Sequence, residues 1–226
     1  MKKVISLLLV VAMCMTLVAC GGGKKKALEL SESAFNNVHQ AYEKLDVIGN
    51  DILDAWKLGV YNERYLCEWS SGFGYFVSNI SIPRDALLDG LASLEHKVSE
   101  YSLDLDYYTE SVREYYDLYW DRLIERSSDT FSACIVLVVE SYIISGELKE
   151  VESLLSLASE SIKELSQDHS DYEHYKNVKN YFTVVNTYFN FCSNPSGTLE
   201  QAMENVNGYN NTANECYNSL YYFFEE

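Results

Sequence analysis

The spacing of apolar residues constrains the fold of this chain more than any other feature. In five stretches, apolar residues recur at alternating steps of three and four, over 35–59, 87–123, 148–165, 175–192 and 199–220. This spacing places them on one face of an α-helix, and its mean of 3.5 residues is the repeat of a coiled-coil seam. In the first stretch two positions of the repeat, Gly49 and Gly59, lack a large side chain.

The residues that interrupt these stretches are typical of helix ends. Pro83 suits the opening of a helix, Asp129 and Thr198 can cap helix starts, and Gly146 suits the end of one. We expect helices over 28–65, 84–126, 129–145, 147–167, 170–192 and 198–224, the second with a bend near 102–106, and no strand. Short turns make successive helices antiparallel. The predicted fold is therefore all-α, an elongated antiparallel helical bundle with coiled-coil-like seams, occupying 28–226.

The N-terminus has the composition of a secretory signal. Lys2 and Lys3 precede an apolar run that ends in small residues at Ala19 and Cys20. The run from Val4 to Ala19 falls just short of the roughly 17 to 25 residues that cross a bilayer. A cleaved signal is therefore a better interpretation than a transmembrane anchor.

The end of this run, Leu17-Val18-Ala19-Cys20-Gly21, resembles the lipobox of bacterial lipoproteins, and the resemblance covers residues 1–21. It implies that the signal peptide 1–19 is removed and that the sulfur of Cys20 carries a diacylglycerol. We expect residues 20–27, with three glycines and three lysines, to form a flexible basic tether near the lipid head groups. The implied location is extracytoplasmic, anchored by lipid to the bacterial cell membrane. Exposure to a periplasm or to the medium stays open.

The charge of the remaining chain excludes one class of partner. All 34 acidic residues but only 12 of the 17 basic residues lie after residue 26, which leaves a net charge near −22. Such a surface repels nucleic acid. It is compatible with basic proteins, cationic peptides or divalent cations, and it also serves solubility alone.

One stretch, "CEWSSGFGYFVSNISIP" at 67–83, does not fit a helix and predicts an irregular aromatic loop. Its aromatic side chains could bind a ligand, and the tyrosine-rich block at 107–122 could line a groove beside them. The alternative is that all of these rings cap or fill the core. The ligand-binding candidates are Trp69, Phe73, Tyr75, Phe76, Tyr116 and Trp120.

Catalytic and metal-binding patterns are missing from the sequence. The four histidines have no metal-ligand spacing, and no nucleophile, phosphate-loop or dinucleotide motif occurs. We expect no catalytic residue, no cofactor and no metal site. Glu140, in an apolar stretch, is an unusual carboxylate that would need a partner such as Arg122 or Arg126, or an exposed position.

The mature cysteines leave the disulfide question open. Cys192 and Cys216 should lie roughly 25 Å apart along a helical hairpin, too far for a disulfide, whereas a bond between Cys67 and Cys134 remains possible.

The leading functional hypothesis is a non-catalytic, lipid-anchored bundle that binds an envelope or extracellular macromolecule. The alternative is a lipoprotein that binds a glycan, peptide or metal at the aromatic loop or in a groove between helices. The partner and the oligomeric state stay open.

Overall fold

The computed structural model describes residues 2–67, 72–96, 112–127 and 129–224, without the side chains of 2–22, 96, 112–115 and 117. Within these residues the chain is helical apart from short connections, and it contains no strand. The helices are α1 (Lys2–Tyr61), α2 (Glu63–Cys67), α3 (Gly72–Ser78), α4 (Arg84–His96), α5 (Val112–Ser127), α6 (Thr130–Ile144), α7 (Glu147–Asp168), α8 (Tyr175–Ser193) and α9 (Leu199–Phe224). The predicted all-α helical bundle is confirmed.

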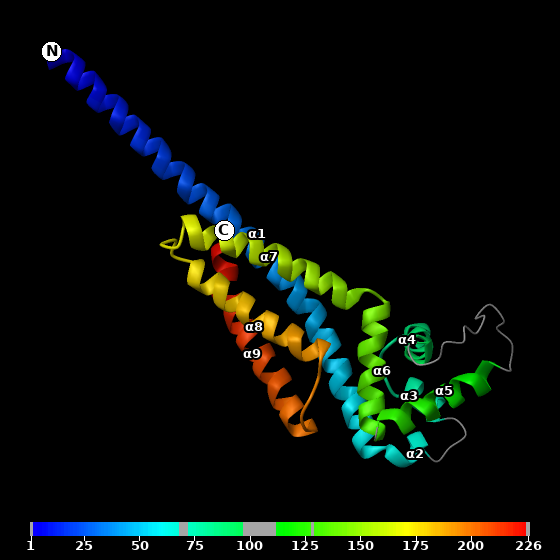
Figure 1. Ribbon diagram of the computed structural model, residues 1–226. Helices are drawn as coiled ribbons and strands as arrows, with labels where there is room; N and C mark the ends of the chain where they lie inside the picture. The colour runs from blue at the N-terminus through cyan, green and yellow to red at the C-terminus, as the bar shows by residue number, and fades with distance from the viewer. Residues whose placement is uncertain (1, 68–71, 97–111, 128, 225–226) are drawn as a thin grey trace.

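Helix α1 is the axis about which the rest of the chain packs (Figure 1). Helices α7, α8 and α9 lie along α1 and form a four-helix bundle with it. Helix α6 crosses α1 near the C-terminal end of α1, and the shorter helices α2, α3, α4 and α5 cluster around α6 there. The molecule therefore has a long bundle and, at one end, a compact group of shorter helices.

The seams predicted from the spacing form the core. In α7 the buried residues are the six that the spacing selects: Leu148, Val151, Leu155, Ala158, Ile162 and Leu165. In α1 the whole predicted set from Phe35 to Gly59 is buried. Burying one apolar stripe per helix stabilises the bundle by roughly 25 cal/mol for each Å² removed from water.

The glycine at position 49, one of two in the first seam, is explained by a close contact between α1 and α8. A Cβ atom at Gly49 would overlap the Tyr188 hydroxyl and lie 2.7 and 2.8 Å from two carbons of that side chain. Tyr188 is fully buried, so its ring fills the space that a larger residue at position 49 would occupy. The absence of a side chain at 49 is thus part of the seam.

Three predicted helix boundaries have the expected local chemistry. The Asp129 carboxylate accepts a hydrogen bond from the Ser132 N–H at 2.8 Å, and α6 begins at the next residue. Gly146 adopts the left-handed conformation between α6 and α7, with φ of 83°. Thr198 and Gln201 exchange hydrogen bonds of 3.0 and 3.2 Å between backbone N–H and side-chain oxygen, a capping box at the start of α9.

Other boundaries differ from the prediction. The helix expected over 28–65 ends at Tyr61, and α2 follows after Asn62. Within the helix expected over 84–126, the structure describes α4 and α5, which point in different directions (Figure 1), and the bend expected at 102–106 lies outside the described residues. The helix expected from 170 begins at Tyr175. Part of the stretch 67–83, expected to be irregular, forms α3.

The region expected to be a flexible tether is continuous with α1 and packs against the bundle. Ala27 is 1% exposed, and the Lys26 ammonium pairs with the Glu164 carboxylate on α7. A Cβ atom at Gly23 would lie 3.7 Å from the His169 ring at the end of α7. Packing therefore begins near Gly23 and not at residue 28, because helix α1 extends past the end of α7.

Candidate functional site

Four of the six predicted aromatic candidates lie in the core. Phe73, Phe76, Tyr116 and Trp120 are buried, and their rings contact one another with centroid separations of 5.2 to 6.0 Å. The Trp120 indole N–H donates to the Leu66 carbonyl at 3.0 Å. These contacts are the core-capping arrangement that the sequence left as the alternative, and none of the four rings is open to a ligand.

The remaining two candidates have different positions. The half-buried Tyr75 donates a hydrogen bond to Asn62 Oδ1 at 3.1 Å and stacks on Tyr65 at 5.2 Å. Trp69 lies outside the described residues. The Cys20 side chain, predicted to carry lipid, also lies outside the described side chains.

Glu140 is buried and its position differs from the arginine pairing considered from the sequence. Its Oε1 accepts a hydrogen bond from the Ser93 hydroxyl at 2.6 Å. Arg122 and Arg126 instead contact the buried Glu95 carboxylate, at 2.7 and 3.4 Å. Each of these two buried carboxylates is therefore held by donors from the protein, as a structural role requires.

A third buried carboxylate, Asp51, joins α1 to α6. The Tyr142 hydroxyl donates to Asp51 Oδ2 at 2.5 Å. Burial raises the pKa of Asp51 above its ordinary value, and the hydrogen bond from Tyr142 only partly offsets that effect. The folded protein thus holds this proton more tightly than the unfolded chain, so the contribution of Asp51 to stability falls as the pH rises through its raised pKa.

The four mature cysteines, Cys67, Cys134, Cys192 and Cys216, are free thiols. Only Cys67 is exposed, and its sulfur lies 3.0 Å from the Thr130 hydroxyl. Burial raises the pKa of Cys134 and of Cys192 well above the ordinary thiol value. These two thiols are therefore inert core side chains.

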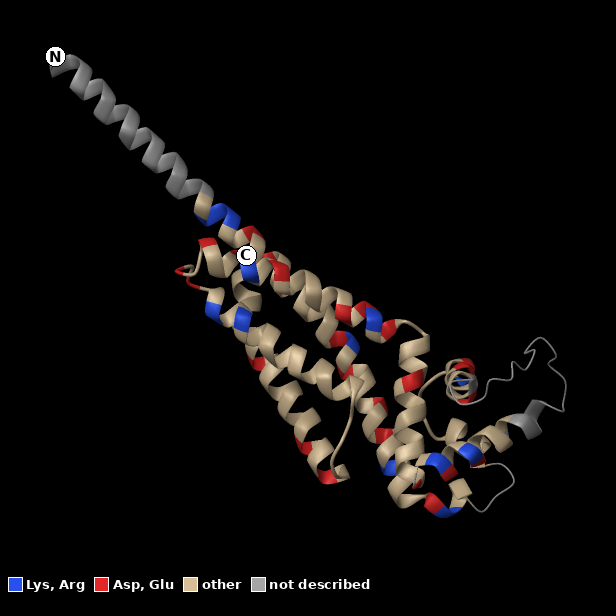
Figure 2. Cartoon of the chain, in the orientation of Figure 1, with Lys and Arg blue, Asp and Glu red and all other residues tan. Residues whose placement is uncertain are grey.

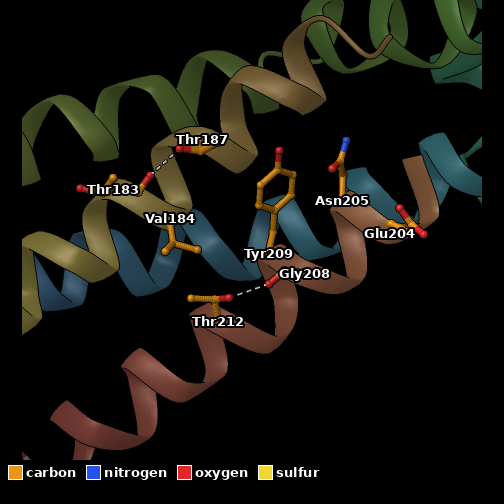
Figure 3. A pocket seen from close by; sticks show the side chains of 8 residues that line it. All are labelled: Thr183, Val184, Thr187, Glu204, Asn205, Gly208, Tyr209 and Thr212. Atoms are coloured by element: carbon orange, nitrogen blue, oxygen red, sulfur yellow. Dashed lines mark hydrogen bonds between the residues drawn. The ribbon is translucent and has the colours of Figure 1, made fainter. Parts of the chain in front are cut away.

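An open cleft of about 350 Å³ lies between α8 and α9, and none of the predicted candidates lines it (Figure 3). On α8, Thr183 and Thr187 are one turn apart. On α9, Glu204, Gly208 and Thr212 follow one another at steps of four residues and line the other side of the cleft. The Tyr209 ring stands between the two helices and stacks on Tyr188 at 5.1 Å. The lining residues are Thr183, Val184, Thr187, Glu204, Asn205, Gly208, Tyr209 and Thr212.

The cleft presents a mainly apolar surface although three of its residues are threonines. Each threonine hydroxyl donates to a carbonyl four residues earlier in its own helix, at 2.8 Å. An occupant would therefore meet mostly methyl groups, Val184 and the Tyr209 ring. Glu204 and Asn205 supply polar groups on α9.

Gly208 is the most informative residue of the cleft. Glycine inside a helix costs about 1 kcal/mol relative to alanine. Gly208 has no positive φ to justify that cost, and a Cβ atom there would have no neighbour within 4 Å. Packing within the described chain thus does not require a glycine, whereas close approach of an occupant would.

Sequence reasoning missed this cleft. Its residues look like an ordinary helix surface, and the space exists only because small side chains on two helices face each other. The one local signal was Gly208 in the middle of a predicted helix.

No protein-family model, curated protein or solved structure matches this chain.

Among the described residues, no group of three or more histidine, cysteine, aspartate or glutamate side chains could hold a metal ion. Over the same residues, none of the helices is long and apolar enough to cross a bilayer by itself. The bent pair Leu118–Ser127 and Thr130–Ile144 satisfies the length and composition criteria only when taken together.

Proposed function

We propose that this protein is a lipid-anchored, extracytoplasmic helical bundle that binds another macromolecule at the bacterial cell envelope and has no catalytic activity. The observation that carries the proposal is the open cleft between α8 and α9, floored by Gly208. The lipobox-like segment ending at Cys20 supplies the location.

The shape of the cleft favours a segment of a protein over a small molecule. Small-molecule sites usually enclose most of their ligand's surface. This cleft is open along two parallel stripes of small side chains, which is the geometry in which a helix or an extended segment lies in a groove. The strongly acidic surface favours a partner with basic residues beside its apolar contacts.

Photocrosslinking in cells that produce the full-length chain tests this proposal. A photoreactive residue replaces Asn205 in the cleft, and a matched control replaces Ser156, an exposed residue of α7. We expect a discrete adduct from position 205 and none from position 156. Gly208→Leu should abolish the adduct by filling the cleft, and Gly208→Ala should weaken it, because its methyl group stands where close approach of an occupant needs a glycine.

Two outcomes contradict the proposal. Adducts that are equal at both positions, or that survive Gly208→Leu, would place the partner elsewhere. A mass spectrum of the cell-derived protein without acyl groups on Cys20 would remove the anchor.

A second candidate, binding of a glycan or peptide ligand in the same cleft, is favoured by the Tyr209 ring beside Asn205 and Glu204. An aromatic face next to a few polar groups suits such ligands. Thermal-shift measurements against envelope glycan fragments and short peptides separate the two candidates. A shift that Tyr209→Ala removes favours the small ligand.

A further inference from the structure

The end of the bundle that receives α1 from Cys20 is rich in aromatic rings. It contains Gly23, the turn between α7 and α8, and the C-terminal turn of α9, which lie together in Figure 1. The Phe223 ring lies 3.5 Å from the His174 ring, between centroids, and Phe224 packs on Phe35 at 5.1 Å. Tyr222 projects outward and is 76% exposed.

The distance from the predicted lipid to this end is short. Cys20 precedes Gly23 by three residues, which span at most about 11 Å even when fully extended. Because the Gly23 backbone already lies beside His169, an acyl group on Cys20 would bring these aromatic rings to the level of the head groups. The C-terminal end of α1 is about 57 Å away along the helix, at 1.5 Å per residue from Gly23 to Tyr61.

The chemistry of this end suits a membrane interface. Tyrosine is enriched where bilayers meet water, because its ring is apolar and its hydroxyl stays hydrated. Lys24, Lys25 and Lys26 are exposed on α1 at this end, and further basic residues lie at the start of α8 (Figure 2). Lys25 pairs with Glu29 and Lys26 with Glu164, so these ammonium groups neutralise nearby carboxylates and lower the repulsion between the acidic bundle and an anionic surface.

We propose that this end, comprising Tyr222 and its neighbouring rings at the C-terminus of α9 and in the turn between α7 and α8, binds the membrane interface and holds the bundle upright on the bilayer. The proposal rests on the lipid anchor of the proposed function. The aromatic end would be a second contact with the membrane, besides the lipid, and would fix the orientation of the bundle. Residues 20–27 would then act as a helical continuation of the bundle and not as the flexible tether expected from the sequence.

Lipid-quenching measurements on the acylated protein test this orientation. The chain is reconstituted into vesicles of phosphatidylcholine and phosphatidylglycerol whose acyl chains carry a bromine quencher. A fluorophore is attached either to Ser170→Cys in the turn between α7 and α8, with Cys67 and Cys216 changed to serine, or to the native Cys67 at the opposite end. We expect strong quenching at 170 and almost none at 67.

The contribution of the aromatic end is then measured with Tyr222→Ser, which should lower quenching at 170 severalfold. Because Tyr222 is largely exposed, the fold should persist, and circular dichroism checks this. Equal quenching at 170 and 67 would show a bundle that lies flat or tumbles. Quenching at 170 that is unaffected by Tyr222→Ser would show that the lipid anchor alone keeps position 170 near the bilayer. Either result overturns the proposal.

The experiment also separates this inference from the proposed function. Loss of acyl groups, read by mass spectrometry before the fluorescence measurement, refutes the lipid anchor. An acylated protein with equal quenching at both positions keeps the anchor and refutes only the interfacial contact.

Discussion

Replacing Gly49 by alanine tests the central contact of the bundle. In an isolated helix this substitution is favourable by about 1 kcal/mol, because alanine is the better helix former. In this protein the new methyl group would overlap Tyr188, with ring carbons 2.7 and 2.8 Å from it. Tyr188 is fully buried and stacked on Tyr209, so it cannot move into solvent.

The expected magnitude follows from these opposing effects. Overpacking of a well-filled core costs about 1 to 3 kcal/mol, and an immobile aromatic ring places this site near the upper value. After the gain in helix propensity, Gly49→Ala should destabilise the protein by about 2 kcal/mol. In a domain of this size the melting temperature falls by roughly 4 to 8 °C.

Gly208→Ala is the matched control, because it makes the same change inside a helix where nothing lies within 4 Å. It should stabilise the protein by about 0.5 to 1 kcal/mol. Urea unfolding of the chain from Gly21 onward, followed by circular dichroism, measures both variants. If Gly49→Ala were as stable as Gly208→Ala, the packing of α1 against α8 would be refuted.

A double-mutant cycle identifies the source of the loss. The Tyr188 hydroxyl has no well-aligned hydrogen bond within the described residues, although the Asn210 side chain lies near it. Tyr188→Phe alone should therefore change stability little, but it should recover part of the loss in Gly49→Ala by removing the overlapping oxygen. Zero coupling would show that the destabilisation arises elsewhere.

Three further outcomes are expected. Cys67 should react with a maleimide far faster than the buried Cys134 and Cys192, which should react only after denaturation; rapid modification of Cys134 in the folded protein would contradict its burial. Asp51→Asn should stabilise the protein more at pH 7.5 than at pH 4, measured by urea unfolding, because the raised pKa of Asp51 makes its ionised form unfavourable in the folded state; an effect independent of pH would refute this. A chain beginning at residue 28 should melt below one beginning at Gly21, because it lacks Ala27 and the ion pair of Lys26 with Glu164; equal melting temperatures would show that these contacts add nothing.

The sequence predicted best where one helix buries a single stripe. Every predicted seam residue of α7 is buried, because α7 presents one narrow face to α1 and α8. Helix α8 contacts α1, α7 and α9, so it buries a wider face. The spacing selected Phe182 and Phe189, whereas the fully buried tyrosines of α8 are the adjacent Tyr181 and Tyr188.

Features that depend on two distant segments could not be read from local patterns. The periodicity over 84–126 is the same in α4 and in α5, because both helices bury apolar residues at the same spacing, and it carries no sign that the two helices point in different directions. The aromatic residues at 72–76 have the composition of a binding loop. In the fold, however, Trp120 from α5 packs against Phe73 and Phe76 and buries them. The cleft at Gly208 is defined by side chains that are small, and small exposed residues carry no periodic signal.

The two proposals together determine how a partner reaches the cleft. Thr183 and Thr187 lie 8 and 12 residues after the start of α8, which begins at the end assigned to the membrane. At 1.5 Å per residue, they stand about 12 to 18 Å above that end. This height exceeds the Debye length of about 8 Å at physiological ionic strength, so head-group charges are largely screened there.

The cleft opens to the side of an upright bundle, so its partner approaches parallel to the membrane and needs an extracytoplasmic segment at that height. In the proposed orientation, a partner confined to the head-group layer would not reach the cleft. A long helical insertion after Cys20 would move the cleft away from the membrane. It should weaken the crosslink from position 205 to a membrane-embedded partner and spare a crosslink to a soluble protein.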